Sequence, residues 1–268
     1  LGDLGLAFNQ MAEGIKERNL MRQSLELAME IQQNLLPKDN PKVKGLDIAG
    51  KSVYCDETGG DYYDFLKLKE NGSGKIGVIL GDISGHGIPS ALLMATARAV
   101  IRQRSFLPGS LTEIITDINV LLCEDAMESN SFMTLFYMVI DTKTKNFKWI
   151  RAGHDPAIIY DPKSDIFEEI RGPAGVPLGV VPDCCYEENE KVGLEKGQVI
   201  VISTDGINEA VNPQKEMYGK EPVLNTIRKN KNGTAEEILE AIIADLNRFR
   251  KGLDLQDDVT LIVIKIMD

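Results

Sequence analysis

The residues best placed to do chemistry in this 268-residue sequence are aspartates at the ends of apolar segments. They occur in four short motifs: GGDYYD (Asp61 and Asp64), LGDISGHG (Asp82), ISTDGINE (Asp205) and QDDVT (Asp257 and Asp258). Apolar runs precede Asp82 and Asp205, and another run follows the pair in QDDVT. If these runs are β-strands, their ends can lie on one rim of a sheet or sandwich, where the carboxylates would converge.

Converging carboxylates cannot all remain ionised in a low-dielectric cleft unless cations compensate their charge. Oxygen ligands without His or Cys select Mg²⁺, Mn²⁺ or Ca²⁺ over zinc or copper. Glycines beside the aspartates would let backbone carbonyls and waters approach such an ion. A metal would therefore supply the counter-charge that Asp82 lacks in its sequence neighbourhood.

Each motif also has a simpler interpretation as a turn. Asp before Gly is common in turns, and Asp at a strand end often caps the next helix. For one motif alone the turn is the better interpretation, but four motifs that each adjoin an apolar run favour the metal centre.

Other chemistries have weaker support. The stretch NGSGKIG at 71–77 lacks the spacing of a phosphate-binding loop and is better explained as a glycine turn. Ser84 is not in a GxSxG motif, because Asp82 occupies the first glycine position. The two histidines are expected in structural roles, His86 near the start of a helix and His154 in a loop.

Composition excludes several classes of protein. A net charge of −11 argues against a nucleic-acid-binding surface, which needs clusters of Lys and Arg. The four cysteines form no CxxC motif, so a zinc site or a disulfide framework is not expected. We find no secretory signal and no apolar run of the roughly 18 residues that a membrane span needs. The abrupt start without Met suggests a piece of a longer chain.

Residues 1–36 are expected to form a helix with a narrow apolar stripe. Its two segments carry the apolar residues Leu4, Phe8, Met11 and Ile15, and then Met21, Leu25, Ala28 and Leu35. The stripe slips by one residue between the segments, as joined coiled-coil segments often do. Such a helix must pack on a partner, either its own domain or a second copy in a parallel dimer. Pro37 is expected to end it.

From Leu46 onward, strand-like and helical segments predict an α+β fold. The strand-like segments are 47–54, 61–68, 75–82, 132–141, 147–154, 157–161, 198–204 and 258–266. The helical runs are 88–104, 110–128, 220–230 and 235–251. Because the helices fall in two blocks between groups of strands, a layered sandwich is favoured over a doubly wound parallel sheet.

Five motifs in order resemble the metal-dependent protein phosphatase 2C (PP2C, or PPM) superfamily. They are GGDYYD, GDISGHGIPSALLMA, AGHDPAIIY, STDGINEA and QDDVTLIVIK, and the resemblance covers about residues 46–267. It is strongest for the bacterial serine phosphatases of the RsbU and SpoIIE type. LGDLGLAFNQMAEGI is similar to the C-terminal end of a HAMP signal-relay module, and LAMEIQQNLLP to the helix that connects it to the phosphatase. We therefore expect a HAMP end and helical linker at 1–36 and the phosphatase domain at 37–268.

The resemblance implies a PP2C-like β-sandwich flanked by helices, with two Mn²⁺ or Mg²⁺ ions, or three, at one rim. By motif, Asp82 would bridge both metals and Ile83 would offer its backbone carbonyl. The remaining implied ligands are Asp205 and Asp257 for the first metal, Asp61 for the second, and Asp258 beside them. The resemblance implies catalytic roles for Asp61, Asp82, Asp205 and Asp257.

The implied activity is hydrolysis of phosphoserine or phosphothreonine on a regulatory partner, by water that two metal ions activate. In this branch the usual substrate is an anti-sigma-factor antagonist of the STAS type. A signal would reach the domain through the N-terminal helix, which we expect to form a homodimer. The chain would be the cytoplasmic domain of a membrane-anchored sensor, with its membrane segments outside this sequence.

One departure from the family pattern concerns the general acid. Eukaryotic members carry a histidine two residues after the bridging aspartate, where this chain has Ser84, and His86 lies two residues further on. Two alternatives to an active protein phosphatase stay open. One is a weak or inactive phosphatase fold that serves as a binding or signalling module. The other is a small-molecule phosphoester hydrolase, which would need an enclosing pocket with basic residues.

Overall fold

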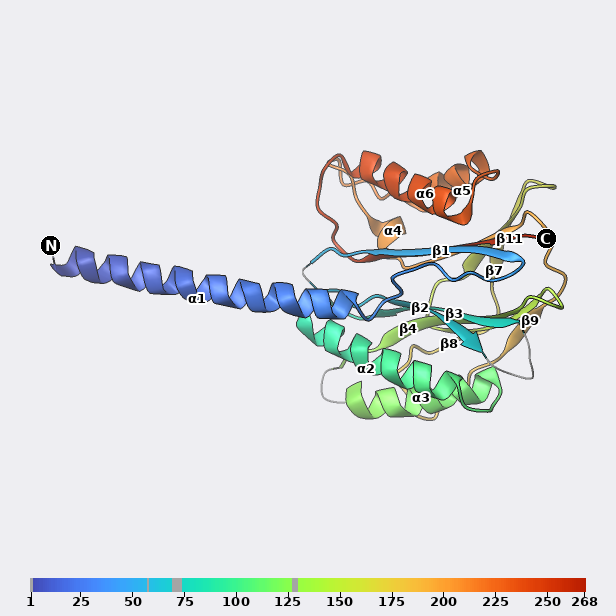
Figure 1. Cartoon of the computed structure of the whole chain (residues 1–268), viewed down its shortest axis with the longest axis horizontal. Helices are drawn as coiled ribbons and strands as arrows, with labels where there is room; N and C mark the ends of the chain where they lie inside the picture. Colours follow the sequence, from blue (N-terminus) through green and yellow to red (C-terminus); the bar gives the residue numbers. More distant parts are fainter. Residues whose placement is uncertain (1, 57, 69–73, 127–129) are drawn as a thin grey trace.

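The chain folds into two stacked β-sheets with helices on both outer faces, and one long helix projects from this body (Figure 1). A computed structural model describes residues 2–56, 58–68, 74–126 and 130–268. The α+β sandwich expected from the sequence is confirmed, including the separation of the helices into two blocks.

The first sheet is antiparallel. Its order is β1 (Leu46–Val53), β11 (Val259–Ile266), β10 (Val199–Ser203), β6 (Ala157–Asp161) and β7 (Ile166–Ile170). The C-terminal strand β11 lies inside the sheet, between β1 and β10.

The second sheet is a meander extended by two short segments. Its order is β2 (Tyr62–Leu68), β3 (Lys75–Ile83), β4 (Met133–Asp141), β5 (Asn146–Ala152) and β8 (Ala174–Gly175), while β9 (Asn189–Lys191) also pairs with β5. All its strand pairs are antiparallel except β5 with β8.

Successive side chains of β11 alternate between the two cores that cover the two faces of the first sheet. Ile262, Ile264 and Ile266 belong to the core between the sheets, whereas Leu261 and Val263 belong to a second core under the C-terminal helices. Successive side chains of a strand point to opposite faces, so an unbroken run of β-branched and aliphatic residues suits a strand that is covered on both sides.

The helices cover the outer face of each sheet. On the second sheet, α2 (Ile88–Ser105) packs on β2 and β3, and α3 (Leu111–Ala126) packs on α2 and β5. On the first sheet lie α4 (Gly206–Glu209), α5 (Lys220–Lys229) and α6 (Ala235–Arg250). Thr234 caps α6. Its hydroxyl accepts a hydrogen bond from the Glu237 N–H, and the Glu237 carboxylate accepts one from the Thr234 N–H.

The N-terminal helix α1 (Gly2–Gln33) projects away from the sandwich over most of its length (Figure 1). It ends three residues before the expected end, in a turn that precedes Pro37. Among the described side chains, contact with the domain is seen at the C-terminal end, where Gln32 is buried and where Leu35 and Leu36, just after the helix, pack in or against the core. Of the two alternatives for this helix, packing of its whole length across its own domain is therefore wrong.

Several smaller features differ from the sequence-based expectations. The short elements β7, β8, β9 and α4 had not been expected, because they carry too few residues to show a periodic pattern. Part of the glycine turn at 71–77 and the end of the expected helix 110–128 fall outside the described residues. The four cysteines are free thiols, as expected. Among the described helices, none is both long enough and apolar enough to cross a membrane.

Candidate active site on the rim of the sandwich

Strand pairing in the second sheet brings Asp61 beside Asp82. The chain enters β2 directly after Asp61, and β3 carries Asp82 one residue before its end. Because β2 and β3 are antiparallel and Tyr62 pairs with Gly81, the start of one strand lies against the end of the other.

The same logic places the other aspartates on the facing sheet. Asp205 follows the end of β10, and Asp257 and Asp258 precede the start of β11. Ser203 pairs with Leu261 in this antiparallel pair, so the aspartates meet at one edge. The four acidic segments identified from the sequence therefore supply one rim of the sandwich, two segments from each sheet.

Burial differs strongly among these five carboxylates. Asp61 and Asp258 are buried, Asp82 is half-buried, and Asp205 and Asp257 are exposed. Asp61 accepts a hydrogen bond from the Thr204 hydroxyl at 3.0 Å. Asp258 accepts two from backbone N–H groups, from Cys55 at 2.9 Å and from Gly60 at 2.8 Å.

The aspartates repel one another, and this is visible in their pKa values. The pKa of Asp61 lies well above its ordinary value because the carboxyl is buried and because Asp82 and Asp258 lie near it. Burial, followed by the charges of Asp205, Asp257 and Asp258, raises the pKa of Asp82 to about 7. The pKa values of Asp205 and Asp257 are also raised, first by desolvation and then by neighbouring aspartates.

These donors suit a hard divalent cation. They are all oxygens, and the buried carboxylates are stabilised by hydroxyl and backbone N–H groups rather than by Lys or Arg. Within the residues that the structure describes, no three His, Cys, Asp or Glu side chains are arranged closely enough to hold an ion as they stand. Binding a metal would thus require the carboxylates to close around it.

Glycine is required where the backbone of the rim passes close to other groups. A Cβ on Gly60 would lie 2.7 Å from the Ile83 carbonyl oxygen, and a Cβ on Gly59 would lie 2.2 Å from Asp258. Both distances are shorter than any normal carbon–oxygen contact. The Gly-Gly pair in GGDYYD therefore lets Asp61, Asp258 and the Ile83 carbonyl approach one another.

Asp64 does not belong to this rim, although its motif suggested a shared role with Asp61. Its buried carboxylate forms an ion pair of 2.5 Å with Arg102 of α2 and accepts a hydrogen bond from the Tyr62 hydroxyl at 2.9 Å. It lies further along β2, opposite Ile79, and holds α2 against the second sheet.

The two histidines lie in loops. His86 precedes α2 rather than lying in its first turn, and its ring pairs with Asp56 at 2.7 Å. His154 is buried after β5, as the loop interpretation expected, with Nδ1 2.7 Å from the Thr134 hydroxyl. Burial lowers the pKa of His154 to about 4, so the ring is neutral.

Two residues near the rim had not been identified from the sequence. Gln32, at the end of α1, accepts a hydrogen bond from the Gly59 N–H at 3.2 Å and donates one to the Gly59 carbonyl. Asp155 lies close enough to Asp205 to raise its pKa. The motif AGHDPAIIY contained Asp155, but no periodic or spacing signal distinguishes Gln32 from its neighbours.

Comparison with known proteins agrees with this geometry. Residues 72–267 match the family described as Stage II sporulation protein E (SpoIIE). The phosphoserine phosphatase RsbU of Bacillus subtilis (strain 168) is 28% identical over 263 residues, which cover 97% of this chain and 75% of RsbU.

Solved structures share the fold. The SiaA-PP2C domain of Pseudomonas aeruginosa has a TM-score of 0.78 and 22% identity, covering 94% of this chain and 99% of that one. RsbX in complex with magnesium has a TM-score of 0.61 and 17% identity, covering 85% and 98%. The chain therefore shares the fold of a solved PP2C domain and belongs to the SpoIIE family.

Proposed function

We propose that this chain is a metal-dependent phosphatase that removes phosphate from serine or threonine of a protein partner. The observation that carries the proposal is the convergence of five aspartates from both sheets on one rim. Among the described residues, the hydrogen bonds to the two buried aspartates come from a hydroxyl and from backbone N–H groups rather than from Lys or Arg. RsbU, the relative described above, is a phosphoserine phosphatase.

The residues of the rim divide into two groups. Asp82, Asp205 and Asp257, with the Ile83 carbonyl, are the proposed direct ligands of Mn²⁺ or Mg²⁺, and Asp61 and Asp258 complete the set from the buried side. When bound, two such ions supply an acidified water nucleophile and neutralise charge on the phosphoryl oxygens. Thr204 and the Cys55 and Gly60 amides orient the buried carboxylates.

The proposed substrate is a phosphorylated regulatory protein of the STAS type. Asp205 and Asp257 are exposed, so a phosphate carried on a protein surface can reach the rim. Within the family resemblance, this kind of partner is the usual one, and the acidic chain would dock it through a locally neutral or basic surface.

The first experiment is a phosphatase assay with Mn²⁺ titrated, on a phosphoserine protein and on an aryl phosphate. Asp82→Asn removes the charge at the centre of the rim and is expected to lower turnover by at least about a hundredfold. Asp254→Asn is the matched control, because Asp254 is an exposed aspartate in the loop that leads to Asp257. Turnover that is equal in the Asp82→Asn variant, or absent from the unmodified chain with Mn²⁺ bound, would favour the inactive binding module.

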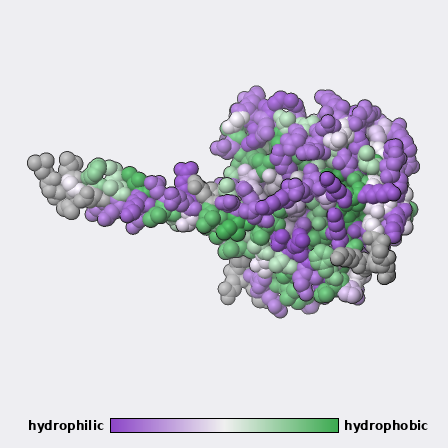
Figure 2. Space-filling model, in the orientation of Figure 1, coloured by the Kyte–Doolittle hydropathy of each residue, from purple (hydrophilic) through white to green (hydrophobic). Residues whose placement is uncertain are grey.

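We further propose that α1 forms a parallel dimer and belongs to a linker that relays signals, at the end of a HAMP module, from a membrane-anchored part of the protein. Its apolar side chains Phe8, Met11, Ile15 and Met21 are more than half exposed. Figure 2 shows such hydrophobic residues interspersed with charged ones along the projecting helix. The α1 helix of a second copy carries the same apolar stripe, so two such helices can pack side by side in register and cover these side chains.

A test of the dimer compares two single substitutions by analytical ultracentrifugation. Met11→Lys places a charge in the apolar stripe and is expected to shift the chain to monomer. Glu17→Lys, on an exposed polar position of the same helix, is the control and should leave the oligomeric state unchanged. A monomeric unsubstituted chain would contradict the dimer proposal and leave the phosphatase proposal standing.

A further inference from the structure

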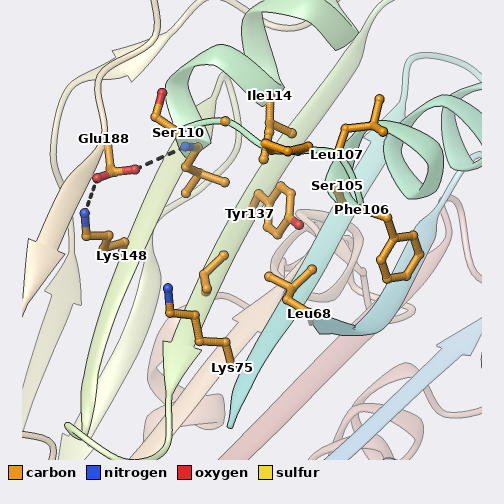
Figure 3. A pocket seen from close by; sticks show the side chains of 14 residues that line it. Leu68, Lys75, Ser105, Phe106, Leu107, Ser110, Ile114, Tyr137, Lys148 and Glu188 are labelled. Atoms are coloured by element: carbon orange, nitrogen blue, oxygen red, sulfur yellow. Dashed lines mark hydrogen bonds and ion pairs between the residues drawn. The ribbon is translucent and has the colours of Figure 1, made fainter. Parts of the chain in front are cut away.

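A cavity of about 500 Å³ lies on the outer face of the second sheet, beneath the loop that joins α2 to α3. Leu68, Tyr137 and Val139 line it from the strands, and Ser105, Leu107 and Leu111 line it from the helical side (Figure 3). Its size falls within the range of about 300–1,000 Å³ typical of small-molecule sites.

This cavity is separate from the aspartate rim. Lys75 lines the cavity and is the first residue of β3, whereas Asp82 lies near the other end of the same strand. Seven residues of extended chain separate them, which corresponds to about 23 Å. A ligand in the cavity would therefore not compete directly with a phosphate at the rim.

Two buried hydroxyls in the cavity wall have unsatisfied hydrogen-bonding capacity. In the part of the chain that the structure describes, the hydroxyls of Tyr137 and Ser105 lie near each other, but neither forms a hydrogen bond of normal geometry, and both residues are more than nine-tenths buried. Burial raises the pKa of Tyr137 to about 12, with the nearby Ser105 hydroxyl acting in the opposite direction, so the phenol stays protonated. An unpaired buried hydroxyl is costly, and a ligand acceptor would remove that cost.

The position of Tyr137 is built into the sheet. A Cβ on Gly77, in the neighbouring strand, would lie 3.1 Å from both the ring and the hydroxyl of Tyr137. Glycine at this position therefore provides the space in which the ring lies flat against the sheet.

The ionic residues around the cavity are two lysines and one glutamate. Lys148 pairs with Glu188 at 2.6 Å, and Glu188 also accepts a hydrogen bond from the Leu111 N–H at 3.2 Å (Figure 3). Lys75 adds a second positive charge. Two of the three ionic side chains that line the cavity are therefore basic, in a chain of net charge −11, and this lining suits an anionic ligand better than a cationic one.

We propose that this cavity binds a small monocarboxylic acid with an apolar body, whose carboxylate accepts hydrogen bonds from the hydroxyls of Tyr137 and Ser105. The apolar body would contact Leu68, Leu107 and Val139. The site is independent of the phosphatase activity proposed above.

The test is isothermal titration of the whole chain with decanoate at pH 7.5. We expect saturable binding with one site per chain, weakened at least about tenfold by Tyr137→Phe, which removes a hydrogen bond to a charged acceptor. Tyr160→Phe is the matched control: Tyr160 is also fully buried, but its hydroxyl is already bonded to Asp165 at 2.8 Å. No binding at 1 mM decanoate, or equal binding by the Tyr137→Phe variant, would overturn the proposal.

Two further measurements separate binding in the cavity from effects on folding. Removing a hydroxyl without a partner should leave the thermal unfolding of the Tyr137→Phe variant unchanged or raise its midpoint. Leu107→Trp enlarges a half-exposed lining side chain and should block decanoate while the fold is retained. Decanol, which lacks the charge, should bind at least about tenfold more weakly; equal affinity would refute the carboxylate preference.

Discussion

At the scale of single residues, the site depends on two glycines as much as on its carboxylates, because the backbone at these glycines passes close to other groups of the rim. Asp61 and Asp258 have their positions because Gly59 and Gly60 leave space beside them. A side chain at either glycine would push the Ile83 carbonyl or the Asp258 carboxylate away from the rim.

Gly60→Ala tests this dependence. Its Cβ would lie 2.7 Å from the Ile83 carbonyl oxygen, so we expect the Mn²⁺ concentration for half-maximal phosphatase activity to rise at least about tenfold. Gly14→Ala is the control, because a Cβ there meets nothing within 4 Å. Equal Mn²⁺ dependence of the Gly60→Ala variant and the unsubstituted chain would show that the close approach is not needed.

His154 makes a pH-dependent contribution to stability. The pKa of the folded ring is about 4, and the unfolded ring titrates near 6.5. Between these values the unfolded chain binds a proton that the folded ring does not. The contribution of the neutral ring to the free energy of unfolding is therefore fully present above pH 6.5 and decreases as the pH falls. At pH 5 the decrease amounts to about 2 kcal/mol.

Denaturant unfolding at pH 7 and pH 5 measures this effect. His154→Gln keeps a group that can bond the Thr134 hydroxyl but cannot titrate, so its loss of stability between the two pH values should be smaller than that of the unsubstituted chain. Asp155 and Arg151, which lie near the ring, are present in both proteins. The difference between the two proteins in the stability lost from pH 7 to pH 5 therefore reports on the His154 ring alone. The same loss in both proteins would contradict a buried neutral histidine.

At the scale of elements, the Gln32 side chain joins the end of α1 to the loop that precedes β2. The Gln32 amide forms two hydrogen bonds with Gly59, and the next residue, Gly60, donates to Asp258. A movement of α1 would therefore displace the loop that holds one of the buried aspartates. This contact gives the proposed relay a physical route.

Gln32→Ala is expected to remove the contact between α1 and Gly59. It leaves the buried N–H and C=O of Gly59 without partners, which costs about 1–3 kcal/mol locally and should raise the Mn²⁺ requirement of the phosphatase. Gln33→Ala is the matched control, since Gln33 is the adjacent helical residue and is exposed. Indistinguishable Mn²⁺ titrations of the two variants would exclude Gln32 as the link.

At the scale of the whole molecule, β11 connects the two cores of the sandwich. Its alternate residues enter the core between the sheets and the core under α4, α5 and α6. Loss of packing in one core should therefore weaken the other through the shared strand.

Cooperative unfolding is the measurable consequence. Val263→Ala alters only the core under the C-terminal helices, whereas Trp149, the single tryptophan, reports on the second sheet. We expect the variant to lose about 1–3 kcal/mol, with the transition shifted equally in Trp149 fluorescence and in far-UV circular dichroism. Two separated transitions would show that the layers unfold independently.

The sequence by itself determined the α+β class and the aspartates of the rim. Apolar runs of period two or of continuous β-branched residues define strands locally, and an aspartate at the end of a run is visible without knowledge of the partner strand. The main strands and helices accordingly lie within a few residues of their expected bounds.

Only the tertiary structure decided which acidic residues act together. Asp61 and Asp64 stand in the same short motif, but Asp61 lies at the rim whereas Asp64, further along β2, pairs with Arg102 of α2. Gln32, the projection of α1 and the cavity around Tyr137 likewise depend on contacts between segments far apart in the chain. Such contacts leave no periodic signal, because hydrogen-bond geometry and packing volume are properties of the assembled layers rather than of any one segment.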